Sequence, residues 1–177
     1  VFRLPFDEGL ARERELFMEC RDSEQSAGQR HVFFAEREAR KIPGVARDTA
    51  ASSIQSAAVI GAGTMGAGIA MVFADAGIPV RIVETDPGVL EKALARISTT
   101  CAGSVKRGRI TEAAMNKCLK LIEGSTDIAD IKDADIVIEA VFEDMDLKKE
   151  IIARLDAVCK PGAILATNTS TLDVDQI

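Results

Sequence analysis

Three glycines near the middle of the chain constrain its fold more than any other feature. Gly61, Gly63 and Gly66 follow the apolar run 58–60 at the spacing G-x-G-x-x-G. This spacing is typical of a strand, a tight turn and a helix, with the turn close to a pyrophosphate, because each step needs the space that a missing side chain leaves. No basic residue stands in 61–68, so the peptide groups and the positive end of the helix dipole are expected to bind the phosphates. The predicted phosphate-binding residues are Gly61, Ala62, Gly63, Thr64, Met65 and Gly66.

The residues that follow support a βαβ unit around this loop. Apolar residues recur at three- and four-residue spacing over 65–76, and Gly77 stands where a helix is expected to stop. A second apolar run, 80–84, follows Pro79 and ends in Glu84. In dinucleotide-binding domains an acid near this distance from the last glycine accepts hydrogen bonds from the ribose hydroxyls.

Two acids compete for the ribose position. Asp86 precedes Pro87, which indicates a helix N-cap followed by proline in the first helical position. We therefore assign Asp86 to capping and Glu84 to the ribose. Because the charge of Glu84 repels a 2′-phosphate, the sequence favours NAD over NADP.

The 177 residues indicate one domain with an appendage. Apolar residues make up 47%, enough for a core, and the net charge of −6 argues against nucleic acid as the main partner. No apolar run approaches the length of a membrane span. The four dispersed cysteines match no metal-site spacing, so we expect reduced thiols and a cytoplasmic location or an organelle matrix.

The chain divides by composition into three parts. Residues 1–41 are charge-dense and predict a helical arm, roughly two helices over 7–21 and 23–41, whose phenylalanines need a partner to bury against. Residues 42–56 are small and polar and indicate a linker, and 57–177 form the nucleotide-binding domain. The single histidine, His31, lies in the arm and is interpreted as structural.

Two further stretches place polar residues at strand ends. The run 135–141 predicts a buried parallel strand that contains an acid, Glu139, and Glu143 with Asp144 follows it. The run 163–167 predicts another strand, followed by the polar cluster 168–171. Because ligands of open parallel sheets bind at the carboxyl ends of the strands, both groups are expected near the cofactor. The predicted fold is α/β, a Rossmann-type doubly wound parallel sheet.

Three motifs in this order resemble the NAD-binding domain of the L-3-hydroxyacyl-CoA dehydrogenase family: residues 61–70, 138–143 and 166–172. The segments 4–13 and 33–37 resemble the connection between the hydratase and dehydrogenase parts of multifunctional fatty-acid oxidation enzymes. The resemblance implies oxidation of 3-hydroxyacyl-CoA to 3-ketoacyl-CoA with NAD, in β-oxidation. It also implies hydratase and C-terminal dehydrogenase domains as partners in the same polypeptide.

The resemblance also implies roles for single residues. It places the glycines on the pyrophosphate, Glu84 on the adenosine ribose, Glu143, Lys148 and Asn168 among the cofactor contacts, and Ser170 at both substrate and cofactor. In this family a histidine held by a glutamate takes the proton from the substrate, and both are expected after Ile177. No metal is implied.

Two alternatives remain open from the sequence. One is a binding module that responds to NAD without catalysis, and the other is a structural protein on the same fold, because fold alone does not specify function. A histidine followed closely by a glutamate downstream would favour the enzyme. Acyl chain length and oligomeric state are not encoded in any motif of these residues.

Overall fold

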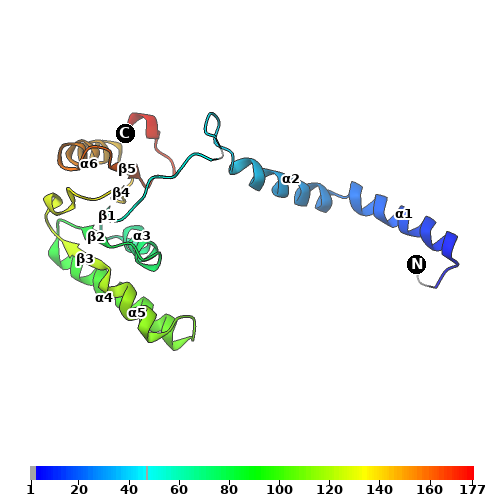
Figure 1. The fold of residues 1–177 in the computed structure, drawn as a ribbon, viewed down its shortest axis with the longest axis horizontal. Helices are drawn as coiled ribbons and strands as arrows, with labels where there is room; N and C mark the ends of the chain where they lie inside the picture. Colours follow the sequence, from blue (N-terminus) through cyan, green and yellow to red (C-terminus); the bar gives the residue numbers. More distant parts are fainter. Residues whose placement is uncertain (1–2, 47) are drawn as a thin grey trace. The chain divides into compact units, whose positions relative to one another are not determined.

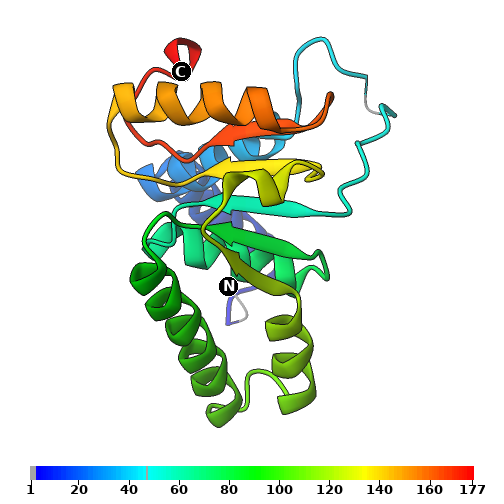
Figure 2. The same cartoon turned by 90° about the vertical axis from the view of Figure 1, so that its left-hand side faces the viewer.

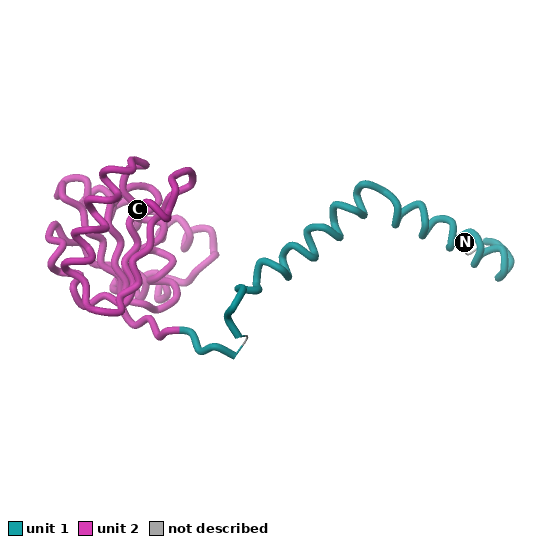
Figure 3. Tube along the Cα trace, turned by 90° about the horizontal axis from the view of Figure 1, so that it is seen from above, with its two compact units in different colours: residues 1–51 teal, residues 52–177 magenta. Residues whose placement is uncertain are grey.

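The computed structural model describes residues 3–46 and 48–177. The chain forms two compact units, Val1–Ala51 and Ser52–Ile177 (Figure 3). The predicted arm lies in the first unit and the predicted nucleotide-binding domain in the second. The predicted linker, 42–56, extends across the boundary between them, and its last residues are tied to the second unit, where Asp135 accepts hydrogen bonds from the N–H groups of Gln55 and Ser56 at 2.7 and 2.9 Å.

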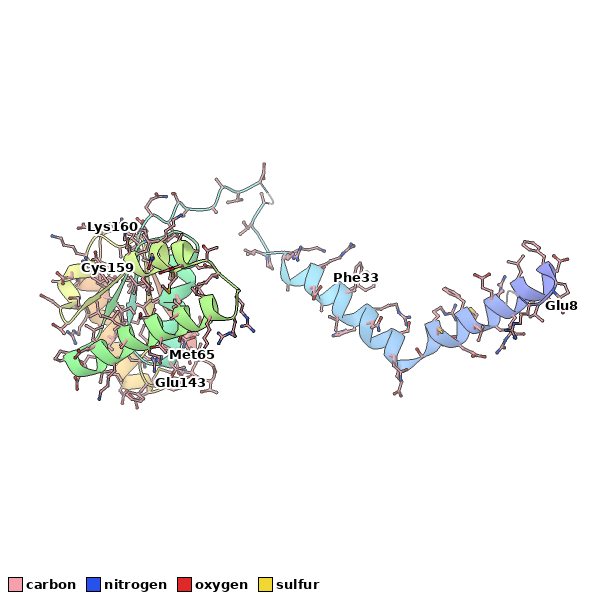
Figure 4. The ribbon with its side chains drawn as sticks, turned by 90° about the horizontal axis from the view of Figure 1, so that it is seen from below. Glu8, Phe33, Met65, Glu143, Cys159 and Lys160 are labelled. Carbon is pink, nitrogen blue, oxygen red and sulfur yellow. The ribbon has the colours of Figure 1, made fainter. Side chains whose placement is uncertain are left out.

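The first unit contains two helices, α1 (Phe6–Asp22) and α2 (Glu24–Ala39) (Figure 1). Ser23 separates them, and its hydroxyl caps α2 by accepting the N–H of Ser26. Within the described residues, Gly9 is the sole buried position of α1, and α2 has none. Phe6, Phe17, Phe33 and Phe34 are exposed, as Figure 4 shows for Phe33. That they pack on other parts of a longer polypeptide stays a prediction.

The second unit is built on a five-stranded parallel sheet (Figure 2). The strands are β1 (Ala57–Ile60), β2 (Val80–Val83), β3 (Ile122–Ser125), β4 (Ile136–Glu139) and β5 (Ile164–Thr167), in the order β3-β2-β1-β4-β5. In register, Val59 lies between Ile82 on one side and Ile138 on the other. The strand order reverses between β1 and β4, which places the ligand crevice of such sheets at the carboxyl end of β1.

Helices cover both faces of this sheet. On one face α3 (Thr64–Asp75), α4 (Pro87–Lys106) and α5 (Glu112–Lys120) pack on alternate residues of β1 and β2, among them Val59 and Ile82. On the other face α6 (Met145–Val158) and the 3-10 turn η1 (Ile128–Ile131) pack on the remaining residues, such as Ala58 and Val137. A last 3-10 turn, η2, spans Val174–Gln176. The predicted doubly wound α/β fold is confirmed.

The edge strand β3 differs from the sequence interpretation. No strand was predicted here from the sequence, but α5 ends at Lys120 and Ile122 begins β3. This strand reads Ile-Glu-Gly-Ser and carries little of the apolar pattern that marks a strand. Gly124 lets it approach α4, since a Cβ there would lie 3.0–3.1 Å from side-chain carbons of Leu90 and Leu94.

Two structural features are absent from residues 3–46 and 48–177. No helix of this part is long and apolar enough to cross a membrane. Within the same residues no group of three His, Cys, Asp or Glu is arranged to hold a metal ion. The four cysteines are free, and burial is the main cause that raises the pKa of Cys118 and Cys159.

Candidate cofactor-binding site

The three glycines of the loop between β1 and α3 differ in what a side chain would meet there. Gly61 has φ +100°, and a Cβ there would lie 2.8 Å from the carbonyl oxygen of Ala140. At Gly66 a Cβ would overlap the carbonyl oxygen of Gly61, so the helix packs directly on the turn. At Gly63, by contrast, no atom lies within 4 Å of the Cβ position. The loop therefore presents open space at the glycine that was predicted to approach the pyrophosphate.

Helix α3 points its free N–H groups at this space. Gly63 is the N-cap and offers no side chain as an acceptor, and the N–H of Ala67 donates to Gly63 O at 3.0 Å. The N–H groups of Thr64, Met65 and Gly66 lie before that bond, in the first turn, where an α-helix has no acceptors of its own. Such N–H groups and the positive end of the helix dipole favour an anion, and binding of the pyrophosphate there stays a prediction.

Glu84 and Asp86 have different roles in the structure, and the role of Asp86 as a helix cap is the one that the sequence predicts. Asp86 caps α4 by accepting the N–H groups of Gly88 and Val89 at 2.7 and 3.1 Å. Glu84 lies at the end of β2 and accepts the N–H of Ala62 at 3.1 Å. The carboxylate of Glu84 thus supports the glycine loop directly, and its contact with a ribose stays a prediction.

A cavity of about 790 Å³ joins most of the predicted site residues, but Ala62, Gly66 and Lys148 are not part of its lining. The glycine loop contributes Gly61, Gly63, Thr64 and Met65, and the end of β2 contributes Glu84. The opposite side is formed by residues that follow β4 and β5: Val141, Phe142, Glu143, Asn168, Ser170 and Thr171. Figure 4 shows Met65 and Glu143 at one edge of this unit, with Cys159 and Lys160 at the other. The carboxyl end of the sheet therefore carries the site.

Glu143 organises the segment that contains Ser170. Its Oε1 accepts the Thr169 hydroxyl at 2.5 Å, the Ser170 N–H at 3.0 Å, and both the N–H and the hydroxyl of Thr171 at 3.2 and 3.3 Å. These donors, led by the Thr169 hydroxyl, lower the pKa of Glu143 to about 2. Asp144, the other acid here, caps α6 through the N–H of Leu147 at 2.9 Å. Glu143 is therefore a clamp for Ser170 in addition to its predicted cofactor contact.

Lys148 lies beneath the site in a buried ion pair. Both Lys148 and Glu139 are 0% exposed, and Lys148 Nζ lies 2.9 and 2.8 Å from the two carboxylate oxygens of Glu139. The ammonium also donates to Asn168 O at 3.3 Å, so each of its three N–H groups has an acceptor. Glu139 accepts further bonds from Thr167 Oγ1 and Val141 N at 2.6 and 2.7 Å. The pair thus joins β4, α6 and the end of β5, and cofactor contact by Lys148 stays a prediction.

One residue at the site was missed from the sequence. Arg96, on α4, donates from Nη2 to the carbonyl oxygens of Gly63 and Ala62 at 2.9 and 3.3 Å. The loop has no basic residue of its own, but the fold brings one to it from 33 residues away. No motif or spacing around Arg96 marked it, because its contact is made between α4 and the loop after β1.

Comparison with known proteins agrees with this site. Residues 56–177 match the family described as "3-hydroxyacyl-CoA dehydrogenase, NAD binding domain". The chain belongs to this family. NAD is the cofactor that the family binds, which confirms the cofactor predicted from the glycine loop and Glu84.

The curated relatives that this chain matches are longer than the chain. The chain is 44% identical over 177 residues to the peroxisomal bifunctional enzyme of Cavia porcellus, covering 98% of the chain and 24% of the relative. It is 41% identical over 170 residues to a peroxisomal fatty acid beta-oxidation multifunctional protein of Oryza sativa subsp. japonica, covering 96% and 23%. The chain therefore spans about a quarter of the length of these relatives.

Solved structures show the same domain. The 3-hydroxybutyryl-CoA dehydrogenase of Escherichia coli K12 matches with a TM-score of 0.69 and 38% identity, over 71% of this chain and 26% of that one. The dehydrogenase part of multifunctional enzyme 1 from C. elegans matches with a TM-score of 0.69 and 30% identity, over 77% and 32%. The resemblance drawn from the three sequence motifs is confirmed.

Proposed function

We propose that this chain is the NAD-binding part of a 3-hydroxyacyl-CoA dehydrogenase that oxidises 3-hydroxyacyl-CoA to 3-ketoacyl-CoA. The observation that carries the proposal is the single cavity that joins the glycine loop, the acid Glu84, and the Ser170 segment clamped by Glu143. Many reactions use the same fold, and membership of the dehydrogenase family supports this one.

The residues of the chain divide the work of the reaction. The glycine loop would hold the pyrophosphate, Glu84 the adenosine ribose, and Glu143, Lys148 and Asn168 would lie toward the nicotinamide. When bound, NAD supplies the hydride acceptor. Ser170 would contact the substrate hydroxyl, with its backbone fixed by the bond from its N–H to Glu143. Holding Ser170 in one position limits the orientations of the substrate before reaction.

The proton of the substrate hydroxyl needs an acceptor, and the residues that line the cavity include no histidine, cysteine or lysine. Hydride leaves the substrate carbon as the hydroxyl proton is taken up, which requires a base whose pKa is near the operating pH. The sequence contains one histidine, His31, on α2, and the sequence pattern around it indicates a structural role. Glu143 is held far below that range, with a pKa of about 2. We therefore propose that the base is supplied by a part of the longer polypeptide outside these 177 residues.

The 177-residue chain is accordingly expected to bind NADH and to show no turnover. Titration of the chain with NADH, followed by nucleotide fluorescence, measures binding, and reduction of acetoacetyl-CoA measures catalysis. Binding without turnover is the expected result. Appreciable turnover by this chain would place the base within it, and failure to bind NADH would remove the basis of the proposal.

Cofactor choice is expected to depend on Glu84. Glu84→Ala removes the acceptor for the ribose hydroxyls and for the Ala62 N–H, and should weaken NADH binding by roughly 1–3 kcal/mol. It also removes the negative charge that opposes a 2′-phosphate, so the preference for NADH over NADPH should narrow. Parallel fluorescence titrations with the two nucleotides give both quantities.

Asp86→Ala is the matched control for this change. It removes an acid two residues away whose role in the structure is to cap α4. Loss of the cap should lower the free energy of unfolding by about 1 kcal/mol and leave the nucleotide preference as it was. The opposite pattern, with Asp86→Ala abolishing binding in a folded chain and Glu84→Ala silent, would show that Asp86 is the ribose ligand.

The longer relatives support the proposal that this domain is part of a multifunctional polypeptide. Their printed names describe bifunctional or multifunctional peroxisomal enzymes. We propose that this chain likewise belongs to a polypeptide with an enoyl-CoA hydratase part and a C-terminal dehydrogenase domain, acting in β-oxidation within an organelle matrix such as the peroxisome.

A further inference from the structure

The glycine loop is held from two sides by side chains of opposite charge. The N–H of Ala62 donates to Glu84 Oε2 at 3.1 Å, and the carbonyl oxygen of Ala62 accepts from Arg96 Nη2 at 3.3 Å. Arg96 Nη2 also donates to Gly63 O at 2.9 Å. Both polar groups of the Ala62 backbone are therefore fixed by residues of other elements, β2's end and α4.

The contacts of Glu84 and Arg96 with the loop determine the direction in which the backbone N–H groups of the loop point. In a trans peptide the C=O of one residue and the N–H of the next point in opposite directions. Because Ala62 O is directed to Arg96, the N–H of Gly63 points away from Arg96. Because Gly63 O is also directed to Arg96, the N–H of Thr64 points away from it as well. Gly63 and Thr64 line the cavity, whereas Arg96 is not among its lining residues. The guanidinium therefore holds the carbonyls on the outer side of the loop and the N–H groups on the cavity side.

The charge of Arg96 acts in the same direction. A carbonyl oxygen near a phosphate repels it, and a guanidinium on these two carbonyls offsets their negative partial charges. The loop has no basic side chain in 61–68, so Arg96 supplies the positive charge bonded to it. Both effects favour an anion on the cavity side.

We propose that Arg96 is a positioning residue for the cofactor pyrophosphate, acting through the Ala62 and Gly63 carbonyls. The inference rests on the proposed NAD binding of this chain and adds a determinant of affinity that lies outside the glycine motif. It predicts a specific loss for ligands that carry phosphates. An effect on the adenosine end of the cavity is not expected, because Arg96 contacts the loop and not the cavity.

The test uses the 177-residue chain with Arg96→Gln, Arg96→Lys and the control Lys92→Gln. Lys92 is exposed on α4 one turn before Arg96, so its replacement removes the same charge from the same helix. NADH is titrated by fluorescence at low and high salt, and ADP-ribose and adenosine are measured as competitors. Arg96→Gln should weaken NADH and ADP-ribose about tenfold and leave adenosine unchanged, and its NADH affinity should depend less on salt than that of the wild type.

The remaining variants separate orientation from charge. Arg96→Lys keeps the charge without the planar donor pair and should recover part of the affinity, and Lys92→Gln should match the wild type. Wild-type affinity in Arg96→Gln, or equal losses for ADP-ribose and adenosine, would overturn the proposal while leaving NAD binding intact. If the wild-type chain itself fails to bind NADH, the proposed function fails first and this inference fails with it.

Discussion

Lys148→Met is expected to lower the free energy of unfolding of the chain by about 3–5 kcal/mol. The change leaves Glu139 charged, fully buried and without its partner, because Lys148 Nζ bonds both of its carboxylate oxygens. Methionine fills a similar volume, so the loss reflects the unpaired charge and not a cavity. Urea unfolding of both proteins measures the difference in the free energy of unfolding, provided that the two m-values are the same.

The neighbouring lysine provides the control for this prediction. Lys149→Met makes the same chemical change at an exposed position of α6 and should shift stability by less than about 0.5 kcal/mol. The double variant Glu139→Gln with Lys148→Met removes the stranded charge and keeps an oxygen for the Val141 N–H. It should be more stable than Lys148→Met alone. A small loss in Lys148→Met, or additive losses in the double variant, would show that the pair does not hold this part of the sheet.

Sequence reasoning succeeded where structure is decided by neighbouring residues. The glycine spacing predicted the turn at Gly61 and the close packing at Gly66, since both depend on a few adjacent peptides. The Asp86-Pro87 pair predicted the start of α4 for the same reason. The run 135–141 predicted the buried strand β4, because both of its faces are covered by helices.

Sequence reasoning did not predict contacts between elements that are far apart in the chain. The sequence placed the acid Glu139 in a buried strand, but nothing in the spacing identified Lys148 as its partner. The Glu143 clamp joins β4's end to the segment after β5, and the Arg96 contact joins α4 to the loop after β1. Each is set by how helices pack across the sheet, which a pattern of local residues does not encode.

Gly66→Ala is expected to weaken NADH binding about 10–100-fold and to lower the free energy of unfolding by about 1–3 kcal/mol. The added Cβ would overlap the carbonyl oxygen of Gly61, and it would lie 3.3 Å from a methyl carbon of Val59. The first obstacle is backbone, so the start of α3 must move away from the turn. That movement displaces the N–H groups of Thr64 and Met65 from the positions at which they would bind the pyrophosphate.

Gly68→Ala tests whether any alanine in this helix has the same effect. Gly68 lies two residues further along α3, and no atom comes within 4 Å of its Cβ position. Alanine there should raise the free energy of unfolding by up to about 1 kcal/mol, since it is the better helix former, and leave NADH binding unchanged. Fluorescence titration and urea unfolding of both variants give the comparison. Normal NADH affinity in Gly66→Ala would mean that contact between helix and turn does not set the position of the phosphate-binding groups.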